Sequence, residues 1–244
     1  MTTIGYGVDL SHWNDVNKVP WDSFPGIVDF VICRAAYGSG LRDRAVVEHM
    51  RRARQVVPKV GLYHFFRPSQ DWSAQWDLLR EVADAVQLTD GDIVPALDIE
   101  LDPFPVPTPV SPEWEPACRE FVEKISEVYG DAMVYITQRE FGMLGKPAWV
   151  LRQPLWVAHY TAAAAPASPG GIIPTIWQHR VGPFDPKAPG GYDKVHPDFD
   201  QDRLILPLPI IGQPEPELLS NGERARIMGL IAETESEEIQ DDTT

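Results

Sequence analysis

Eight short runs of apolar, β-prone residues recur along the chain, and helix-like segments separate the early ones. The helix-like segments are Arg42–Val57, Ala74–Gln87 and Pro112–Tyr129. Strands that alternate with helices at this spacing predict a mainly parallel sheet with right-handed crossovers. The β-prone runs are Ile4–Leu10, Val28–Ala35, Val60–Phe66, Ile93–Ile99, Ala132–Thr137, Leu155–His159, Thr175–Gln178 and Phe199–Leu206.

The pattern changes after residue 138. The segments between the last β-prone runs are rich in Pro, Gly and Ala and hold no long helix. Eight strands with helices mainly in the first half predict an α/β fold of the irregular (β/α) barrel kind. Functional residues of such barrels gather at the carboxyl ends of the strands.

Local signals mark where the helices should begin. We expect Asp43 to cap the helix that it precedes, and Asp71 or Ser73 to cap the next one. Ser111-Pro112-Glu113 is typical of an N-cap, an N1 proline and a first-turn acid.

The last part of the chain differs from the rest in composition. We expect a barrel domain over residues 1–207 and an acidic linker or tail over 208–244, partly disordered and with one short helix. Residues 214–244 carry nine acids and two arginines, so they account for about half of the net charge of −15. No cluster of Lys and Arg stands out, which excludes non-specific nucleic-acid binding.

A proline-rich segment, 101–112, follows the fourth β-prone run, with prolines at 103, 105, 107, 109 and 112. This composition predicts a stiff, extended loop that walls one side of a cleft. The N-terminus has neither a basic region nor a long apolar segment. We therefore expect synthesis in the cytoplasm without a signal peptide, and no membrane insertion.

The strongest chemical pattern is the apolar run Ile93–Ile99, which contains Asp98 and is followed directly by Glu100. Side chains at i and i+2 of a strand share a face, about 7 Å apart. Two carboxyl groups held close disfavour joint ionisation, so one keeps its proton to higher pH. A protonated and an ionised carboxyl group side by side are what glycosidic cleavage requires. Alone, such a pair is also typical of a solvated strand end.

Two further acids occupy comparable positions. Asp9 lies in Gly7-Val8-Asp9-Leu10-Ser11, at the end of the first run, and Asp200 lies in the last run. The first and last strands of a closed barrel are neighbours, so both acids are expected to border the cleft. For Asp200 a plain loop position is nearly as good an interpretation.

Several motifs occur together in one order: Gly-Val-Asp-Leu-Ser, Gly61-Leu-Tyr-His-Phe-Phe66, Ala96-Leu-Asp-Ile-Glu100, Leu155-Trp-Val-Ala-His-Tyr160 and Ile176-Trp-Gln178. As a set, over residues 4–206, they resemble glycoside hydrolase family 25, the Chalaropsis-type lysozymes of bacteria, fungi and phages. The resemblance implies an irregular (β/α) barrel that hydrolyses the β-1,4 bond between N-acetylmuramic acid and N-acetylglucosamine. The proline-rich loop departs from the family pattern, and no cell-wall-binding repeat follows the barrel.

The resemblance also implies roles for individual residues. Glu100 is expected to be the general acid, and Asp98 to assist at the anomeric centre, directly or through the 2-acetamido group of the substrate. Asp9 and Asp200 are expected to line the catalytic cleft. The expected sugar contacts are Tyr63, Tyr135, Trp156, Tyr160 and Gln178, although a core position is an equally good interpretation of Trp156.

Metal chemistry is the weaker interpretation. His12, His64, His159 and His179 are single and scattered, and neither they nor Cys33 and Cys118 show metal-ligand spacing. We therefore expect no cofactor, no metal and no disulfide.

The expected partner is bacterial peptidoglycan, bound by a monomer that acts on the cell wall. The chain would reach the wall either as a phage lysin, released with a holin-like partner, or as part of a virion. A glycan-binding barrel and a virion-associated scaffold, both without catalysis, remain as alternatives.

Overall fold

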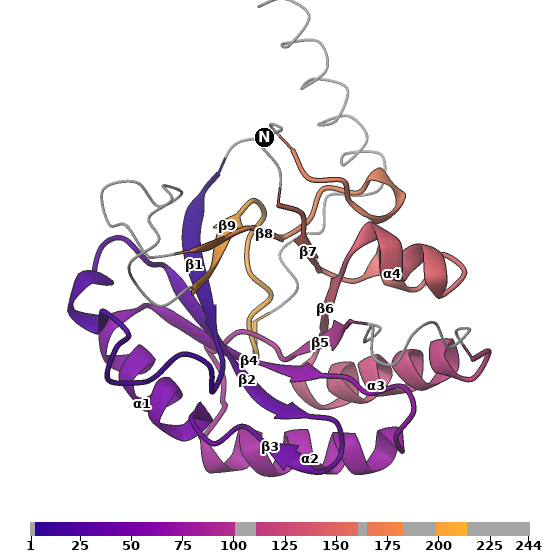
Figure 1. Ribbon diagram of the computed structural model, residues 1–244, viewed down its shortest axis with the longest axis horizontal. Coiled ribbons are helices and arrows are strands. Elements are labelled where there is room, and N and C mark those ends of the chain that lie inside the picture. Colours follow the sequence, from indigo (N-terminus) through magenta and orange to yellow (C-terminus); the bar gives the residue numbers. More distant parts are fainter. Residues whose placement is uncertain (1–2, 101–110, 161–164, 183–198, 214–244) are drawn as a thin grey trace, which may run out of the picture.

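A computed structural model describes residues 3–100, 111–160, 165–182 and 199–213. Eight strands form a closed barrel, because β1, at one end of the sheet order, pairs with its neighbour β9 and also with β2 near the other end. Figure 1 shows these strands arranged in a ring. The strands of the ring are β1 (Gly5–Leu10), β2 (Phe30–Tyr37), β4 (Lys59–Phe65), β5 (Ala96–Ile99), β6 (Met133–Ile136), β7 (Leu155–Ala158), β8 (Ile176–Gly182) and β9 (Phe199–Leu204).

The strand directions explain why the barrel is irregular. Neighbouring strands from β1 through β8 pair in parallel, whereas β9 runs antiparallel to both β8 and β1. A two-residue strand, β3 (Leu41–Arg42), pairs antiparallel with the end of β2 outside the ring. The expected eight-stranded (β/α) barrel is therefore confirmed, and its closing strand runs in reverse.

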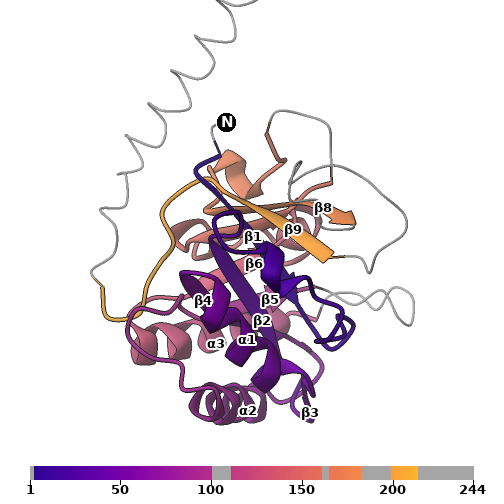
Figure 2. The same ribbon diagram turned by 90° about the vertical axis from the view of Figure 1, so that its left-hand side faces the viewer.

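The helices lie mainly in the first half of the chain, as expected. They are α1 (Val46–Val56), α2 (Trp72–Ala85), α3 (Trp114–Tyr129) and α4 (Gln138–Met143). In Figures 1 and 2, α1, α2 and α3 lie on one side of the barrel, and β8 and β9 lie on the other. The short helix α4 was not predicted from the sequence, because six residues are too few to show a helical period.

Only one of the expected helix starts is confirmed. The carboxylate of Asp71 accepts hydrogen bonds from the backbone N–H groups of Ser73 and Ala74 at the start of α2. The expected cap at Ser111 is wrong, because α3 begins at Trp114 and its N-cap, Glu113, makes no side-chain capping bond.

The expected cap at Asp43 is also wrong. Ala45 is the N-cap of α1. Asp43 accepts a hydrogen bond of 3.0 Å from Nε of the buried Arg34 and another from the N–H of Ala45, which precedes the helix. A buried guanidinium needs a counter-charge more than an exposed helix end needs a cap, because an unpaired buried charge is very costly.

The core has two layers, one on each face of the strands. Between the strands and the helices lies a large cluster that includes Leu62, Leu97 and Phe121. Inside the barrel lies a second cluster that includes Phe30, Tyr63 and Trp156. Successive strand residues face opposite sides, so Leu62 packs outward whereas Tyr63 points into the barrel.

The chain beyond Pro207 continues along the barrel. Ile210 forms a bridge with Ile93, the N–H of Val94 donates to the Pro209 carbonyl at 3.1 Å, and Ile211 is only 7% exposed. We therefore propose that the barrel domain extends past Pro207 to at least Ile211. The proline-rich residues 101–110 and the acidic tail 214–244 lie outside the described residues. No helix in the described ranges is long and apolar enough to cross a membrane.

Candidate active site

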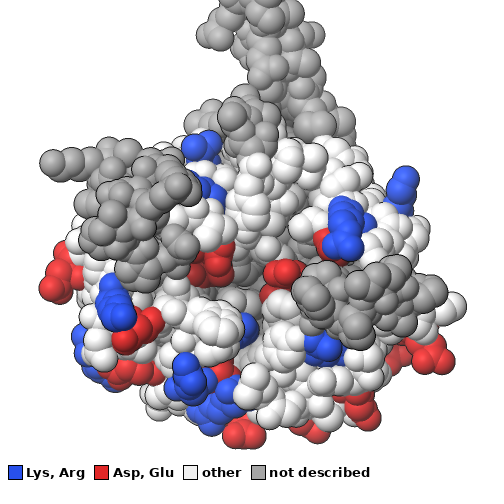
Figure 3. Space-filling model, viewed as in Figure 1, with Lys and Arg blue, Asp and Glu red and all other residues white. Residues whose placement is uncertain are grey.

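The structure brings all nine residues singled out from the sequence to one cavity of about 180 Å³. Most of them project from different strands of the barrel, and Glu100 and Tyr160 follow the ends of β5 and β7 closely. In Figure 3, acidic side chains lie at a hollow near the centre of the view. The residues are Asp9, Tyr63, Asp98, Glu100, Tyr135, Trp156, Tyr160, Gln178 and Asp200.

The two acids of the strongest motif differ sharply in environment. Asp98 is the third residue of β5 and only 4% exposed, whereas Glu100 follows the strand end and is exposed. Burial, and after it the nearby charge of Glu100, raises the pKa of Asp98 well above its ordinary value. Arg34 opposes this shift, because a nearby cation stabilises the carboxylate. The family resemblance implied that Glu100 is the general acid, and burial favours the protonated form of Asp98 in the free protein.

Asp9 and Asp200 face each other across the strands that close the barrel. They are register partners in the antiparallel β1–β9 pair. Burial raises the pKa of Asp9 well above its ordinary value, and the charges of Asp200 and Asp202 raise it further. These acids therefore gather in one small volume, where joint ionisation is disfavoured.

Gln178 connects several of these groups through its side-chain amide. Its Nε2 donates to Oδ2 of Asp9 at 2.8 Å. Its Oε1 accepts from the hydroxyl groups of Tyr135 at 2.9 Å and Tyr160 at 2.6 Å. The two tyrosine hydroxyl groups occupy its oxygen, and its nitrogen is bound to Asp9. Gln178 therefore orients Asp9 and the two tyrosines, and it also lines the cavity.

The aromatic residues divide into buried walls and an exposed rim. Trp156 is 1% exposed and meets the rings of Tyr63 and Tyr135 edge-on, with centroids 5.9 and 4.9 Å away. Its indole N–H donates to Oδ1 of Asp202 at 2.9 Å. Tyr160, at 55% exposure, offers a ring that a sugar can reach.

Sequence reasoning missed four residues that also line the cavity: Ser11, Trp13, Arg34 and Phe65. Two of them have sequence features by which they could have been found. Arg34 is the one charged residue within the apolar stretch Phe30–Tyr37, and Trp13 lies four residues after Asp9. Trp13 is 79% exposed, and its ring contacts that of His12 with centroids 4.4 Å apart. A large aromatic side chain this exposed at a cavity rim is typical of sugar-binding surfaces.

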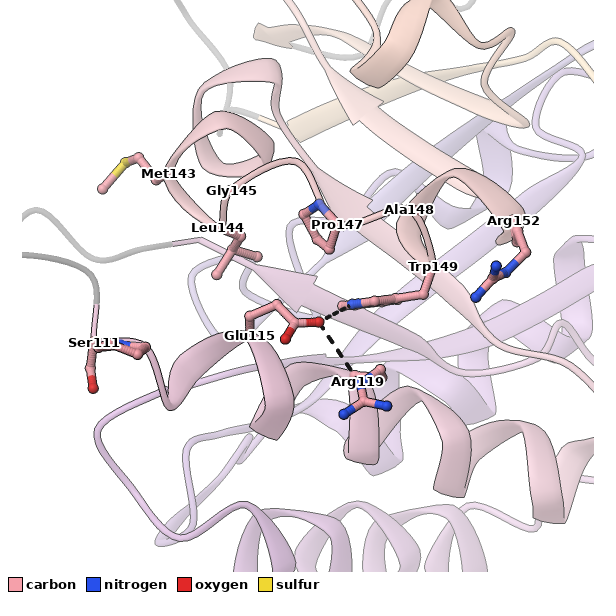
Figure 4. A pocket seen from close by; sticks show the side chains of 11 residues that line it. Ser111, Glu115, Arg119, Met143, Leu144, Gly145, Pro147, Ala148, Trp149 and Arg152 are labelled. Carbon is pink, nitrogen blue, oxygen red and sulfur yellow. Dashed lines mark hydrogen bonds and ion pairs between the residues drawn. The ribbon is translucent and has the colours of Figure 1, made fainter.

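A larger hollow, of about 670 Å³, lies between α3 and the segment that follows α4 (Figure 4). The indole N–H of its buried Trp149 donates to Glu115, which also forms an ion pair with Arg119. None of the nine candidate site residues lines it. Its size therefore does not make it the active site.

The described residues include no group of three or more His, Cys, Asp or Glu that could hold a metal ion. His64 lies within hydrogen-bonding distance of Gln75, and His159 accepts from the N–H of Ala167. Cys33 and Cys118 are free and buried, and burial raises the pKa of each thiol. The geometry therefore supports a packing role for both cysteines, with thiols that are unreactive.

Residues 8–182 match the family model of glycosyl hydrolases family 25. The chain belongs to glycosyl hydrolase family 25. The match begins within β1, ends with β8, and includes eight of the nine cavity residues singled out above, Asp200 being the exception. A comparison with curated proteins finds no match.

Solved structures of similar proteins share this barrel. A bacterial lysozyme from Streptomyces coelicolor is 23% identical, with a TM-score of 0.67 over 84% of this chain and 93% of that one. A family 25 glycosyl hydrolase from Bacillus anthracis is 18% identical, with a TM-score of 0.65 over 88% and 92%. The spore cortex lytic enzyme SleM from Clostridium perfringens is 25% identical, with a TM-score of 0.65 over 82% and 67%. The solved structures support the fold, and membership of family 25 makes this chain a glycoside hydrolase.

Proposed function

We propose that this family 25 hydrolase is a muramidase, which cleaves the β-1,4 bond between N-acetylmuramic acid and N-acetylglucosamine in peptidoglycan. The observation that carries the proposal is the carboxyl pair Asp98 and Glu100, which lies at the carboxyl end of β5 in a cavity lined by tyrosines and an amide. The similar solved structures include lysozymes and the catalytic domain of a phage endolysin, which supports peptidoglycan as the substrate.

In the proposed mechanism the exposed Glu100 donates its proton to the leaving oxygen as the glycosidic bond breaks. The buried Asp98, once ionised, stabilises the positive charge that develops at the anomeric carbon, either directly or by orienting the 2-acetamido group. Water then adds its hydroxyl to that carbon and returns a proton to Glu100. Asp9 and Asp200 orient the substrate and shape the electrostatic field of the cavity.

A barrel that binds glycan or serves as a virion scaffold without catalysis is the alternative. The presence of Asp9, Asp98, Glu100 and Asp200 around one cavity favours the enzyme. We propose that it acts as a monomer on the bacterial wall, and that a holin-like partner would be needed only for release as a phage lysin.

The test is digestion of purified peptidoglycan, followed by borohydride reduction and mass spectrometry of the products. We expect reduced N-acetylmuramic acid at the new chain ends. Reduced N-acetylglucosamine, or stem peptides released from intact glycan, would show a different bond specificity. Bound but uncleaved glycan would support the non-catalytic alternative.

A further inference from the structure

A second cavity, of about 110 Å³, adjoins the catalytic one and shares Arg34 with it. Its wall contains three arginines, Arg34, Arg42 and Arg44, and one acid, Asp43. It lies where β2 ends, at β3 and at the segment that leads into α1. The rest of the chain is strongly acidic, so a cavity with this composition stands out.

The single acid of this cavity is already neutralised. Asp43 accepts hydrogen bonds from Nε of Arg34 at 3.0 Å and from the backbone N–H groups of His12 and Ala45, each at 2.9 Å. A carboxylate held by a guanidinium and two N–H donors leaves little field to attract a further cation or repel an anion.

The other two arginines keep their charge available to a ligand. Arg42 forms only an exposed ion pair with Glu81 at 3.4 Å, and such pairs are weak in water. No described residue forms an ion pair or a side-chain hydrogen bond with Arg44, which is exposed. Arg42 and Arg44 therefore line this cavity with little compensation of their positive charges.

Aromatic rings join the two cavities. Tyr37 lines the arginine cavity and Phe65 lines the catalytic one, and their ring centroids are 4.7 Å apart. The guanidinium of Arg67 lies over the Tyr37 ring, 5.0 Å from its centroid, and also donates to the Tyr37 hydroxyl group. The boundary between the cavities is thus built from the packed rings of Tyr37 and Phe65 and from the shared Arg34.

We propose that the arginine cavity binds the carboxylate of the muramic acid side of the glycan, borne by its lactyl ether or by the peptide attached there. The proposal rests on the proposed function, which makes peptidoglycan the substrate. The acids that line most of the catalytic cavity do not attract such a carboxylate, whereas Arg42 and Arg44 do. This difference in attraction sets which of the two alternating sugars occupies the position next to Arg34.

The test compares soluble glycan strands that carry free lactyl carboxylates with the same strands converted to methyl amides. The wild type should have the lower KM on acid strands. This preference should fall about ten-fold in the double variant Arg42→Ala/Arg44→Ala, as expected for loss of charge-assisted hydrogen bonds. The control Arg51→Ala changes an arginine on α1 that pairs with Glu48, and it should keep the preference.

Equal KM values for acid and amide strands in the wild type, both with and without stem peptides, or an unchanged preference in the double variant, would overturn the proposal. Strands that keep their stem peptides identify the source of the carboxylate: a preference seen only with them points to the peptide. If the wild type cleaves neither strand, the proposed function fails. Titration of the strands onto the protein still reports the carboxylate preference in that case, so the two failures are distinguishable.

Discussion

The amide nitrogen of Gln178 lies 2.8 Å from Oδ2 of Asp9, which ties β8 to β1 across the intervening β9. This bond stabilises the charged form of Asp9 against the burial and neighbouring acids that oppose ionisation. A neutral amide thus orients a buried carboxyl group of the candidate site and offsets part of the rise in its pKa.

Replacing Gln178 should therefore impair catalysis without unfolding the barrel. Gln178→Leu removes the donor to Asp9 and the acceptor of two tyrosine hydroxyl groups, so we expect kcat to fall about 10–100-fold, as for loss of a hydrogen bond to a charged group. Gln55→Leu, on the exposed face of α1, is the control. Adding Asp9→Asn to Gln178→Leu should cost little more, because both act on one group. Fully additive losses would show that Gln178 does not act through Asp9.

Glu100→Gln should remove nearly all turnover on purified peptidoglycan. The amide cannot donate an acidic proton to the leaving oxygen, and loss of a general acid reduces the rate about 10²–10⁴-fold. Circular dichroism should show an unchanged fold, since Glu100 is exposed. The control Glu120→Gln, an exposed residue of α3, should be fully active. A folded Glu100→Gln variant that keeps more than about a tenth of wild-type turnover contradicts the assigned role.

The acidic limb of the pH–rate profile should report Asp98. Its ionised form is the one proposed to act at the anomeric carbon, and its pKa lies well above the ordinary 3.8 because it is buried. Activity should therefore rise with pH only well above pH 3.8. Arg34→Met removes a cation that lowers this pKa, so the limb should move to higher pH. If the limb does not move in a folded Arg34→Met variant, then it does not report the ionisation of Asp98.

Asp202→Asn should stabilise the protein at neutral pH. The carboxyl group is 1% exposed, its Oδ2 has no hydrogen-bond partner among the described residues, and burial raises its pKa well above 3.8. The folded protein then holds this proton more tightly than the unfolded chain, so stability falls as pH rises from about 3.8 through the folded-state pKa. The Tm gain of the variant should be largest near pH 7, about 2–4 °C for each kcal/mol, and vanish near pH 3. A gain in Tm that does not depend on pH would show that ionisation of Asp202 is not its cause.

Two truncations should have opposite outcomes. A chain ending at Gln213 keeps every described contact of the barrel, so its Tm should match that of the full chain. A chain ending at Pro209 loses the bridge to Ile93 and the buried Ile211. Burying one such side chain contributes about 1.5–3 kcal/mol, so Tm should fall by roughly 3–12 °C. Equal Tm values for both truncations would place the domain end before Ile210.

The sequence predicted the barrel and the membership of the cavity better than it predicted local contacts. Apolar runs identify strands because each must bury both faces, and residues at strand ends converge in any closed barrel. The partner of Asp43 could not be predicted in this way, because the cap preference of an aspartate says nothing about a buried arginine on β2. Likewise, the difference in burial between Asp98 and Glu100 depends on neighbouring strands that periodicity does not reveal.

The reversed β9 has a consequence for how the protein is made. β9 comes last among the strands, yet β1 pairs with it, and Asp9 on the one faces Asp200 on the other. Contacts between residues so distant in sequence form late, since a long loop must close first. As the chain leaves the ribosome, β1 and β8 keep unpaired edges until β9 arrives. The cavity wall is completed in the same event, so a nascent chain gains its hydrolase site only when the barrel shuts.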